Sequence, residues 1–302
     1  MCRLFGMASH GRPVTARFWL LDSLDSLVVQ SRREPDGSGL GWYDEDGQAL
    51  VQRDPIPAWR DPHFSYLAGT VTSRRFVAHV RYASTGSIDA SNTHPFLQDG
   101  RLFAHNGVVG DLERLREHLG EDARLARGDT DSELTFALVT RETRACGGDL
   151  VEGIRRAGAW IAEHLPVYAW NIVIATDDEL HALRWPDVHE LWWLDREPGG
   201  HHGVRRFVGA GTREPLAVES SDLASQGAVV VASEPMDDHP GWRRLGSGEL
   251  LSVMRDGRTS VRRLIDVAPA RPLRLDDLDT AAAASQAGAT GPAPAGPSTS
   301  SW

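Results

Sequence analysis

The chain has 302 residues and a formal net charge of −10, which argues against general binding to nucleic acid or to anionic membranes. Its two cysteines, Cys2 and Cys146, exclude a disulfide framework, and no apolar run reaches the roughly 20 residues that span a bilayer. No charged-then-apolar signal segment opens the chain. We therefore expect a cytoplasmic protein that acts on a small polar substrate, and the sequence leaves its oligomeric state open.

Lysine is absent from the sequence, so all 32 basic residues are arginine. This absence excludes Schiff-base chemistry, a pyridoxal-phosphate anchor and the lysine of a phosphate-binding loop. Any chemistry must therefore come from cysteine, histidine, aspartate, glutamate, serine, arginine or the backbone.

The first half of the chain mixes short strands with helical spacings. Strands are expected over residues 4–9, 40–43, 49–53, 75–82 and 101–105, and helical segments over 14–30, 64–71, 111–119, 131–144 and 151–164. A turn at residues 44–47 joins two of these strands into a hairpin, which follows a glycine-rich loop at residues 32–41.

Strands dominate after residue 164. They are expected over residues 169–176, 180–185, 191–194, 205–208, 228–232, 250–255 and 259–264. Runs of strands that alternate with runs of helices favour an α+β layered domain over a parallel, doubly wound one. From about residue 280 the chain is alanine, glycine, proline, serine and threonine without periodicity, so we predict one domain over 1–275 and a disordered tail over 276–302.

Cys2 is a candidate nucleophile, because removal of Met1 would leave a thiol and a free α-amine on the same residue. A free cysteine has a pKa of about 8.5 and an α-amine one of about 7.7 to 8.0, so the amine can accept the thiol proton near neutral pH. The alternative is a small buried residue at the start of an edge strand, which is the common fate of a free cysteine.

Three polar clusters end predicted elements. Arg81 presents a planar fork that suits a carboxylate, or it makes a structural salt bridge. Asn106-Gly107 is first of all a turn signal, although a side-chain amide beside a glycine N–H is also what an oxyanion hole needs. Asp131 either caps a helix or pairs with a substrate ammonium.

Histidines are the remaining candidates for metal ligands. His79, His94 and His105 match no zinc spacing, and His201-His202 in a glycine-rich loop are weaker candidates still. We therefore predict no metal site.

The motifs together resemble the class II glutamine amidotransferases, which are N-terminal-nucleophile hydrolases. The resemblance rests on Cys2 followed in order by residues 81–86 (RYASTG), 92–95 (NTHP), 105–107 (HNG) and 130–133 (TDSE). Residues 35–43 (PDGSGLGWY) and 232–235 (ASEP) are similar to the stand-alone, YafJ-like branch, which includes the amidohydrolase of ergothioneine synthesis. The resemblance covers residues 1 to about 264 and implies a four-layer α-β-β-α sandwich with the nucleophile at the head of a central strand.

The same resemblance implies a role for each site residue. Cys2 would be the nucleophile with its own α-amine as base, and Asn106 with the N–H of Gly107 would form the oxyanion hole. Arg81 would hold the α-carboxylate of a γ-glutamyl group and Asp131 its ammonium, with Asp129 as a competitor for that last role. The remaining residues border or support the site: Tyr82, Ser84, Thr85 and His94.

The implied reaction is hydrolysis of the γ-amide of glutamine or of a γ-glutamyl amide through a Cys2 thioester. It would release glutamate and ammonia or an amine, without a metal or an organic cofactor. Members of the family that synthesise a product carry a second, synthase domain, which this sequence lacks. Two alternatives therefore stay open: an ammonia-supplying subunit that needs a synthase partner, and a non-catalytic binding protein that retains the fold.

Overall fold

The computed structural model describes residues 2–23, 25–84, 86–198, 204–207, 216–219 and 225–287. Within these residues most strands belong to two large sheets. The first sheet has seven strands, in the order β15 (Arg243–Arg244), β11 (Trp192–Arg196), β14 (Ala228–Ala232), β1 (Arg3–Ser9), β6 (Arg75–Arg81), β3 (Gly37–Tyr43) and β4 (Ala49–Asp54). β1 lies inside this sheet and pairs antiparallel with both β6 and β14. Cys2 therefore stands at the head of a central strand, as the family resemblance implies.

The second sheet places the Asn106-Gly107 pair in its interior. Its order among the described residues is β17 (Thr259–Arg263), β16 (Glu249–Val253), β10 (Leu180–Arg184), β9 (Pro166–Ala175), β8 (Arg101–Val109) and β7 (Phe96–Gln98), and β18 (Arg271–Pro272) adds a parallel pairing to β9. Two short pairings complete the strands: β2 (Val14–Thr15) with β5 (Thr72–Ser73), and β12 (Val204–Phe207) with β13 (Leu216–Glu219).

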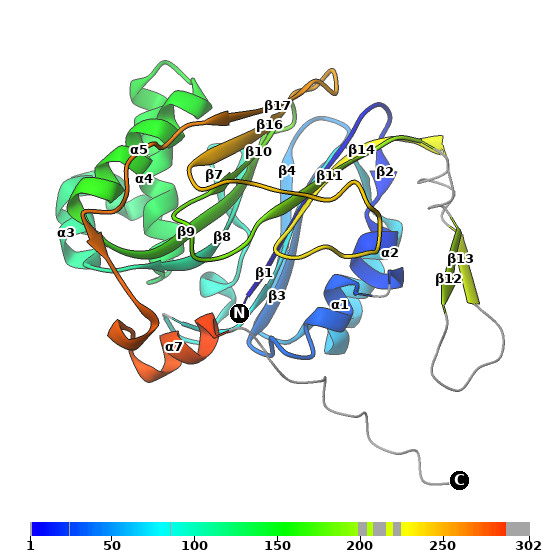
Figure 1. The fold of residues 1–302 in the computed structure, drawn as a ribbon, viewed down its shortest axis with the longest axis horizontal. Coiled ribbons are helices and arrows are strands. Elements are labelled where there is room, and N and C mark those ends of the chain that lie inside the picture. The colour runs from blue at the N-terminus through cyan, green and yellow to red at the C-terminus, as the bar shows by residue number, and fades with distance from the viewer. Residues whose placement is uncertain are drawn as a thin grey trace, which may run out of the picture.

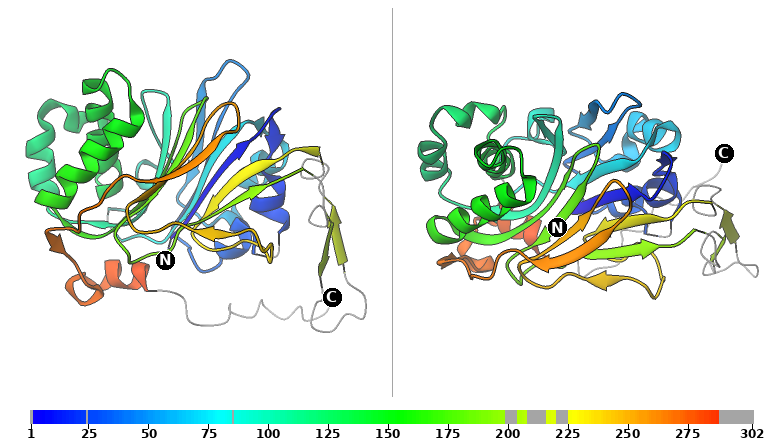
Figure 2. Two further views of the ribbon diagram at one scale, coloured as in Figure 1. Left: turned by 45° about the horizontal axis from the view of Figure 1, so that its top comes forward. Right: turned by 90° about the horizontal axis from the view of Figure 1, so that it is seen from above.

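Helices cover the outer face of each sheet, which gives four layers (Figures 1 and 2). On the first sheet lie α1 (Leu27–Gln30) and α2 (Pro62–Thr70), and on the second lie α3 (Leu112–Leu119), α4 (Asp131–Ala145) and α5 (Leu150–His164). One apolar cluster fills the space between the two sheets, and one lies under each helical layer. The predicted α+β sandwich is therefore confirmed.

Short helical turns connect these layers. They are η1 (Phe18–Asp22), η2 (Ala58–Arg60), η3 (Ala90–Asn92), η4 (Gly120–Leu125) and η5 (Leu275–Asp277). The long helix predicted over residues 14–30 is wrong, because the structure divides this stretch into β2, η1 and α1. Ser23 is extended at the end of η1, and the hydroxyl of Ser26 starts α1 by accepting the N–H of Val29. These two serines end one turn and begin the next.

The predicted tail over residues 276–302 begins too early. Part of η5 and all of α7 (Thr280–Gln286) lie inside it, and Ala282 of α7 packs against Val108, Tyr168 and Ala169. In Figures 1 and 2, α7 lies beside the N-terminal end of the chain. The rest of the predicted tail, residues 288–302, falls outside the described residues, as do Met1, Thr85 and the His201-His202 pair.

Candidate active site

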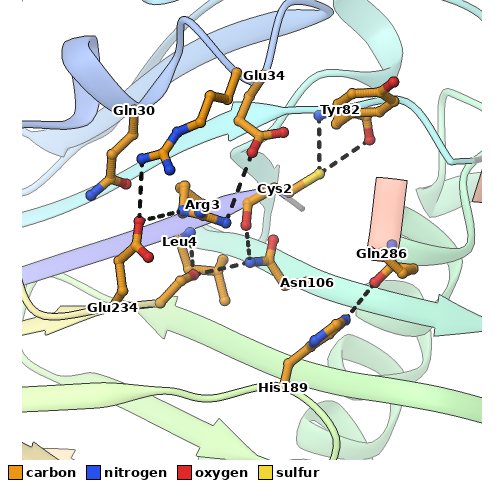
Figure 3. A network of polar contacts seen from close by, with 12 residues as sticks. Cys2, Arg3, Leu4, Gln30, Glu34, Tyr82, Asn106, His189, Glu234 and Gln286 are labelled. Carbon is orange, nitrogen blue, oxygen red and sulfur yellow. Dashed lines mark hydrogen bonds and ion pairs between the residues drawn. The ribbon is translucent and has the colours of Figure 1, made fainter. Parts of the chain in front are cut away.

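Cys2 is buried where β1 meets the end of β6. Arg3 pairs with Val80 across these strands, so the residue before Arg3 lies beside the chain as it leaves β6. Its Sγ lies 3.1 Å from the backbone nitrogen of Tyr82, which donates to it, and 3.2 Å from the carbonyl oxygen of the same residue, to which the thiol donates (Figure 3). The backbone of Tyr82 therefore fixes the direction of the thiol.

The thiol of Cys2 is protonated at neutral pH. Burial, together with the negative charge of Glu34, raises its pKa to about 11, although the hydrogen bond with Tyr82 and the charge of Arg81 act in the opposite direction. A thiolate is the reactive form of cysteine. A nucleophilic role for Cys2 would therefore require a nearby base that accepts its proton.

Asn106 and Gly107 are neighbours of Cys2 but do not form a turn. Both lie within β8, paired with Asn171 and Trp170 of β9, so the turn that the Asn-Gly pair suggests is wrong. The Nδ2 of Asn106 donates to the carbonyl oxygen of Cys2 at 2.7 Å and to the hydroxyl of Ser233 at 3.0 Å. The side-chain amide thus ties the nucleophile's own backbone to β8.

Gly107 has a backbone conformation that side chains rarely adopt, with φ +146°. A Cβ atom at this position would lie 1.8 Å from the carbonyl oxygen of Ala169. Only glycine fits there, because any side chain would push β8 away from β9.

Arg81 ends β6 with its guanidinium buried next to the thiol. Its Nη1 donates to the carbonyl oxygen of Ser87 at 3.0 Å. Burial lowers its pKa, and the negative charges of Asp36, Asp129 and Asp131 partly offset this effect. The guanidinium therefore adds positive charge to a small region bordered by several carboxylates.

Asp131 does not cap α4, because Thr130 does. The hydroxyl of Thr130 accepts the N–H of Glu133 at 3.2 Å, whereas the Oδ2 of Asp131 accepts the N–H of Val109 at 2.9 Å. Asp131 is buried and Asp129 is exposed, with an Oδ1 that packs close to Gly86. The carboxylate of Asp131 is therefore held at the end of β8, two residues beyond Gly107.

Three buried histidines lie in this region, and one of them contacts the amide of Asn106. The Nε2 of His79 lies 3.0 Å from the Oδ1 of Asn106, and His105 contacts the hydroxyl of Ser132 and the carbonyl oxygen of Ala169. Burial lowers the pKa of His79 to about 3 and holds the pKa values of His94 and His105 below their usual range. All three rings are therefore neutral at physiological pH.

His94 differs from the other two histidines in its hydrogen bonding. Among the described residues, neither of its ring nitrogens has a hydrogen-bond partner, although the ring is buried. The ring packs 4.2 Å from the ring of His79 and 4.6 Å from that of Phe96, measured between centroids. His94 therefore brings to this region two buried ring nitrogens that have no hydrogen-bond partner among the described residues.

A cavity of about 20 Å³ joins most of the predicted site residues. It is lined by Cys2, Arg81, Tyr82, Ser84, His94, His105, Gly107, Thr130 and Ser132. Thr85, which we also expected at the site, lies outside the described residues. A cavity of this size holds little more than a water molecule.

Several residues of this site carry no role predicted from the sequence. His105 and Ser132 belong to the 105–107 and 130–133 motifs without an assigned role in the site, yet both line the cavity. Ser233 contacts Asn106, and Glu34 and Glu234 lie on either side of Arg3 (Figure 3). Ser233 and Glu234 belong to the 232–235 motif, for which the sequence predicts no role, and Glu34 lies in the glycine-rich loop at residues 32–41.

Two kinds of site are not found in the part of the chain that the structure describes. It contains no group of three or more histidine, cysteine, aspartate or glutamate side chains placed to hold a metal ion. None of its helices combines the length and the apolar character that crossing a membrane requires.

Comparisons with known proteins agree with this geometry. The γ-glutamyl-hercynylcysteine sulfoxide hydrolase of Mycolicibacterium smegmatis is 30% identical over 274 residues, which cover 86% of this chain and 99% of that protein. The glutamine amidotransferase YafJ of Escherichia coli is 24% identical over 261 residues, 82% of this chain and 96% of that protein. A solved glutamine aminotransferase class-II domain protein from Silicibacter pomeroyi superposes with a TM-score of 0.55 and 25% identity, over 87% of this chain and 99% of that one.

The family described as class-II glutamine amidotransferases matches residues 1–272, which is nearly all of the described chain. This match confirms the resemblance drawn from Cys2 and the four later motifs, including the likeness to YafJ. The chain therefore belongs to the class II glutamine amidotransferases, and it is an enzyme of the amide-hydrolysing kind.

Proposed function

We propose that the protein hydrolyses γ-glutamyl amides through a covalent thioester on Cys2. After Met1 is removed, the α-amine of Cys2 takes the thiol proton as Sγ attacks the γ-carbonyl carbon. The C–N bond then breaks, the leaving nitrogen takes up that proton, and ammonia or an amine departs. Water, deprotonated by the same amine, hydrolyses the thioester and releases glutamate.

The observation that carries this proposal is the convergence of Cys2, Arg81 and Gly107 on one buried cavity. The guanidinium of Arg81 suits the α-carboxylate of the substrate, because its planar fork can make two charge-assisted hydrogen bonds. Ser84 and His94 line the same cavity and would border the bound γ-glutamyl group. Asp131 would pair with the substrate ammonium, although its carboxylate already accepts one backbone N–H.

Asn106 and Gly107 would stabilise the tetrahedral oxyanion. Both N–H groups of the Asn106 amide are engaged in the resting geometry, by Cys2 and by Ser233. One of these bonds must therefore be exchanged for a bond to the oxyanion during the reaction. We expect the bond to the carbonyl oxygen of Cys2 to be the one exchanged, while the bond to Ser233 keeps the amide in place.

The substrate class follows from the relatives. One relative is named for the hydrolysis of a γ-glutamyl conjugate and another for glutamine amidotransfer. Both groups of substrates share the γ-glutamyl part, which Arg81 would hold, and they differ in the amine that leaves. We therefore expect activity on γ-glutamyl derivatives of amines or amino acids, with glutamine as the smallest member.

The test is glutamate release from a panel of γ-glutamyl amides by protein whose Met1 has been removed. Cys2→Ala and a protein with an uncleaved N-terminal tag should both be inactive, with unchanged circular dichroism. Mass spectrometry should detect the γ-glutamyl adduct on Cys2 after rapid acid quenching. Undiminished turnover by either control would refute the mechanism.

A partner-dependent activity is the second candidate. The cavity at Cys2 is far smaller than the few hundred Å³ of an ordinary ligand pocket, which favours a site that opens only when another molecule binds. If a synthase partner opens it, glutamine hydrolysis by the isolated protein should be slow and should increase when the partner is added. Full activity of the isolated protein would exclude this candidate.

A further inference from the structure

The residues that directly follow β14 contact the start of β1, the strand that Cys2 precedes. The ladder between β1 and β14 runs from Ser9↔Ala228 to Phe5↔Ala232, and the next residue is Ser233 of the Ala-Ser-Glu-Pro motif. The N–H of Ser233 donates to the carbonyl oxygen of Leu4 at 3.2 Å, and its hydroxyl accepts the N–H of Leu4 at 2.9 Å. Both polar backbone atoms of Leu4 are thus held by one serine.

The hydroxyl of Ser233 also accepts one N–H of the Asn106 amide, at 3.0 Å. The other N–H of that amide donates to the carbonyl oxygen of Cys2, and its oxygen faces the Nε2 of His79. A primary amide offers two donors and one acceptor oxygen, so these three contacts fix its plane. Ser233 is buried, with 4% of its surface exposed, so no solvent replaces the contact if it is lost.

The neighbouring Glu234 strengthens the same junction. Its Oε1 accepts from the Nε of Arg3 at 2.9 Å, and the Nη1 of Arg3 lies 3.8 Å from the Oε1 of Glu34 (Figure 3). Arg3 and Glu34 are both buried, whereas the side chain of Glu234 is 35% exposed. The two residues after Cys2, Arg3 and Leu4, are therefore held by the side chains of Glu234 and Ser233, which follow β14.

We infer that Ser233 is a positioning residue for the reaction, because it aligns the amide of Asn106 with the carbonyl that Cys2 attacks. This inference rests on the proposed function. Ser233 does not line the substrate cavity described above, so it acts through Asn106 and not on the substrate itself. Without its hydroxyl the Asn106 amide loses one of three anchors and turns away from the position in which it can donate to an oxyanion.

Two reactions of the same thiol separate this role from a general structural one. Amide hydrolysis passes through an oxyanion, whereas alkylation by iodoacetamide forms an S–C bond and expels iodide at a saturated carbon without an oxyanion. Removing an oxyanion-hole donor typically costs about 100- to 1000-fold in kcat. Because Ser233→Ala misaligns the donor and does not remove it, we expect kcat for hydrolysis to fall about tenfold to hundredfold.

The same variant should leave KM and the rate of Cys2 alkylation within about twofold of the wild-type values, because neither depends on the oxyanion. Ser233→Thr keeps the hydroxyl and should recover most of kcat. Ser73→Ala is the matched control, since Ser73 is another buried serine whose hydroxyl accepts a backbone N–H, at the opposite end of β6 from Arg81. It should leave both reactions unchanged.

A double-mutant cycle tests whether the effect passes through Asn106. In an Asn106→Ala background, Ser233→Ala should reduce kcat no further. An equal loss of hydrolysis and alkylation in Ser233→Ala, or a full additional loss in the double variant, would overturn the inference. Unchanged kcat in Ser233→Ala would overturn it as well. A wild-type protein that hydrolyses no γ-glutamyl amide would instead refute the proposed function on which it rests.

Discussion

Gly107 allows a direct test of how closely β8 and β9 approach at the active site. In Gly107→Ala the new Cβ would lie 1.8 Å from the carbonyl oxygen of Ala169, so the two strands must separate by about 1 Å. The φ of +146° adds a backbone cost of about 1–3 kcal/mol for a residue other than glycine. Loss of one or two ladder hydrogen bonds adds about 1 kcal/mol each, so the free energy of unfolding should fall by about 2–5 kcal/mol.

Gly100→Ala is the matched control for this variant. Gly100 also has a positive φ, +71°, but no heavy atom of the described residues lies within 4 Å of the place where its Cβ would be. It should therefore lose only the backbone term, about 1–2 kcal/mol. Urea unfolding followed by circular dichroism gives both values. If the two variants differ by less than about 1 kcal/mol, the close approach of β8 to β9 is not as tight as described.

Three further variants test the site, the buried histidines and α7. Arg81→Ala should raise KM for γ-glutamyl amides about tenfold to hundredfold, because a charge-assisted contact is worth about 1.5–3 kcal/mol. The control Arg144→Ala, on the surface, should leave KM unchanged. If Arg81→Ala and the wild type have equal KM values, Arg81 does not hold the substrate carboxylate. His79 has a pKa of about 3 in the folded chain and about 6.5 in the unfolded chain, so below pH 6.5 only the unfolded chain binds a proton at this residue. The free energy of unfolding should therefore fall by about 1.4 kcal/mol for each pH unit below 6.5. Glu34, whose pKa burial raises to about 7, has the opposite effect on stability between about pH 4.5 and 7. The test therefore compares the wild type with His79→Gln, whose free energy of unfolding should fall less between pH 6 and 4. Parallel plots of unfolding free energy against pH for the two proteins would contradict a neutral, buried His79. Ala282→Arg should detach α7, because Ala282 is buried against β8 and β9, and should speed cleavage of α7 by trypsin. The control Ala284→Arg, on the exposed side of α7, should leave the helix protected. Equal cleavage rates in the two variants would mean that Ala282 does not anchor the helix.

Local patterns predicted most elements well, because their cause is local. The hairpin of β3 and β4 follows from the turn at residues 44–47, and α4 begins at Asp131, where the sequence predicts a helix over residues 131–144. The single helix predicted over residues 14–30 was wrong, because the helical spacing of apolar residues does not reveal that serines end one helical turn and begin the next. α7 was missed because alanine-rich sequence without periodicity gives no sign of the packing of Ala282 against β8 and β9.

The site was predictable only through the order of its motifs. Locally, Asn106-Gly107 indicated a turn, whereas both residues lie inside β8, where contacts from Cys2, His79 and Ser233 decide their conformation. Those contacts join residues far apart in the chain. Their side chains meet only when β1, β6, β8 and β14 come together, so a single sequence cannot show which serine or histidine reaches the amide.

The resting state of the site indicates how its thiol is activated. Burial raises the pKa of Cys2 from 9.0 to about 11, which disfavours the free thiolate by about 3 kcal/mol relative to an unburied cysteine. The charge of Arg81 lowers that pKa, but its effect is smaller than that of burial, so Arg81 does not keep the thiol ionised. A buried thiol of this kind attacks efficiently only if its proton leaves during the attack. In the proposed mechanism the base is the α-amine that removal of Met1 would leave on Cys2, which would lie within reach of Sγ because it belongs to the same residue.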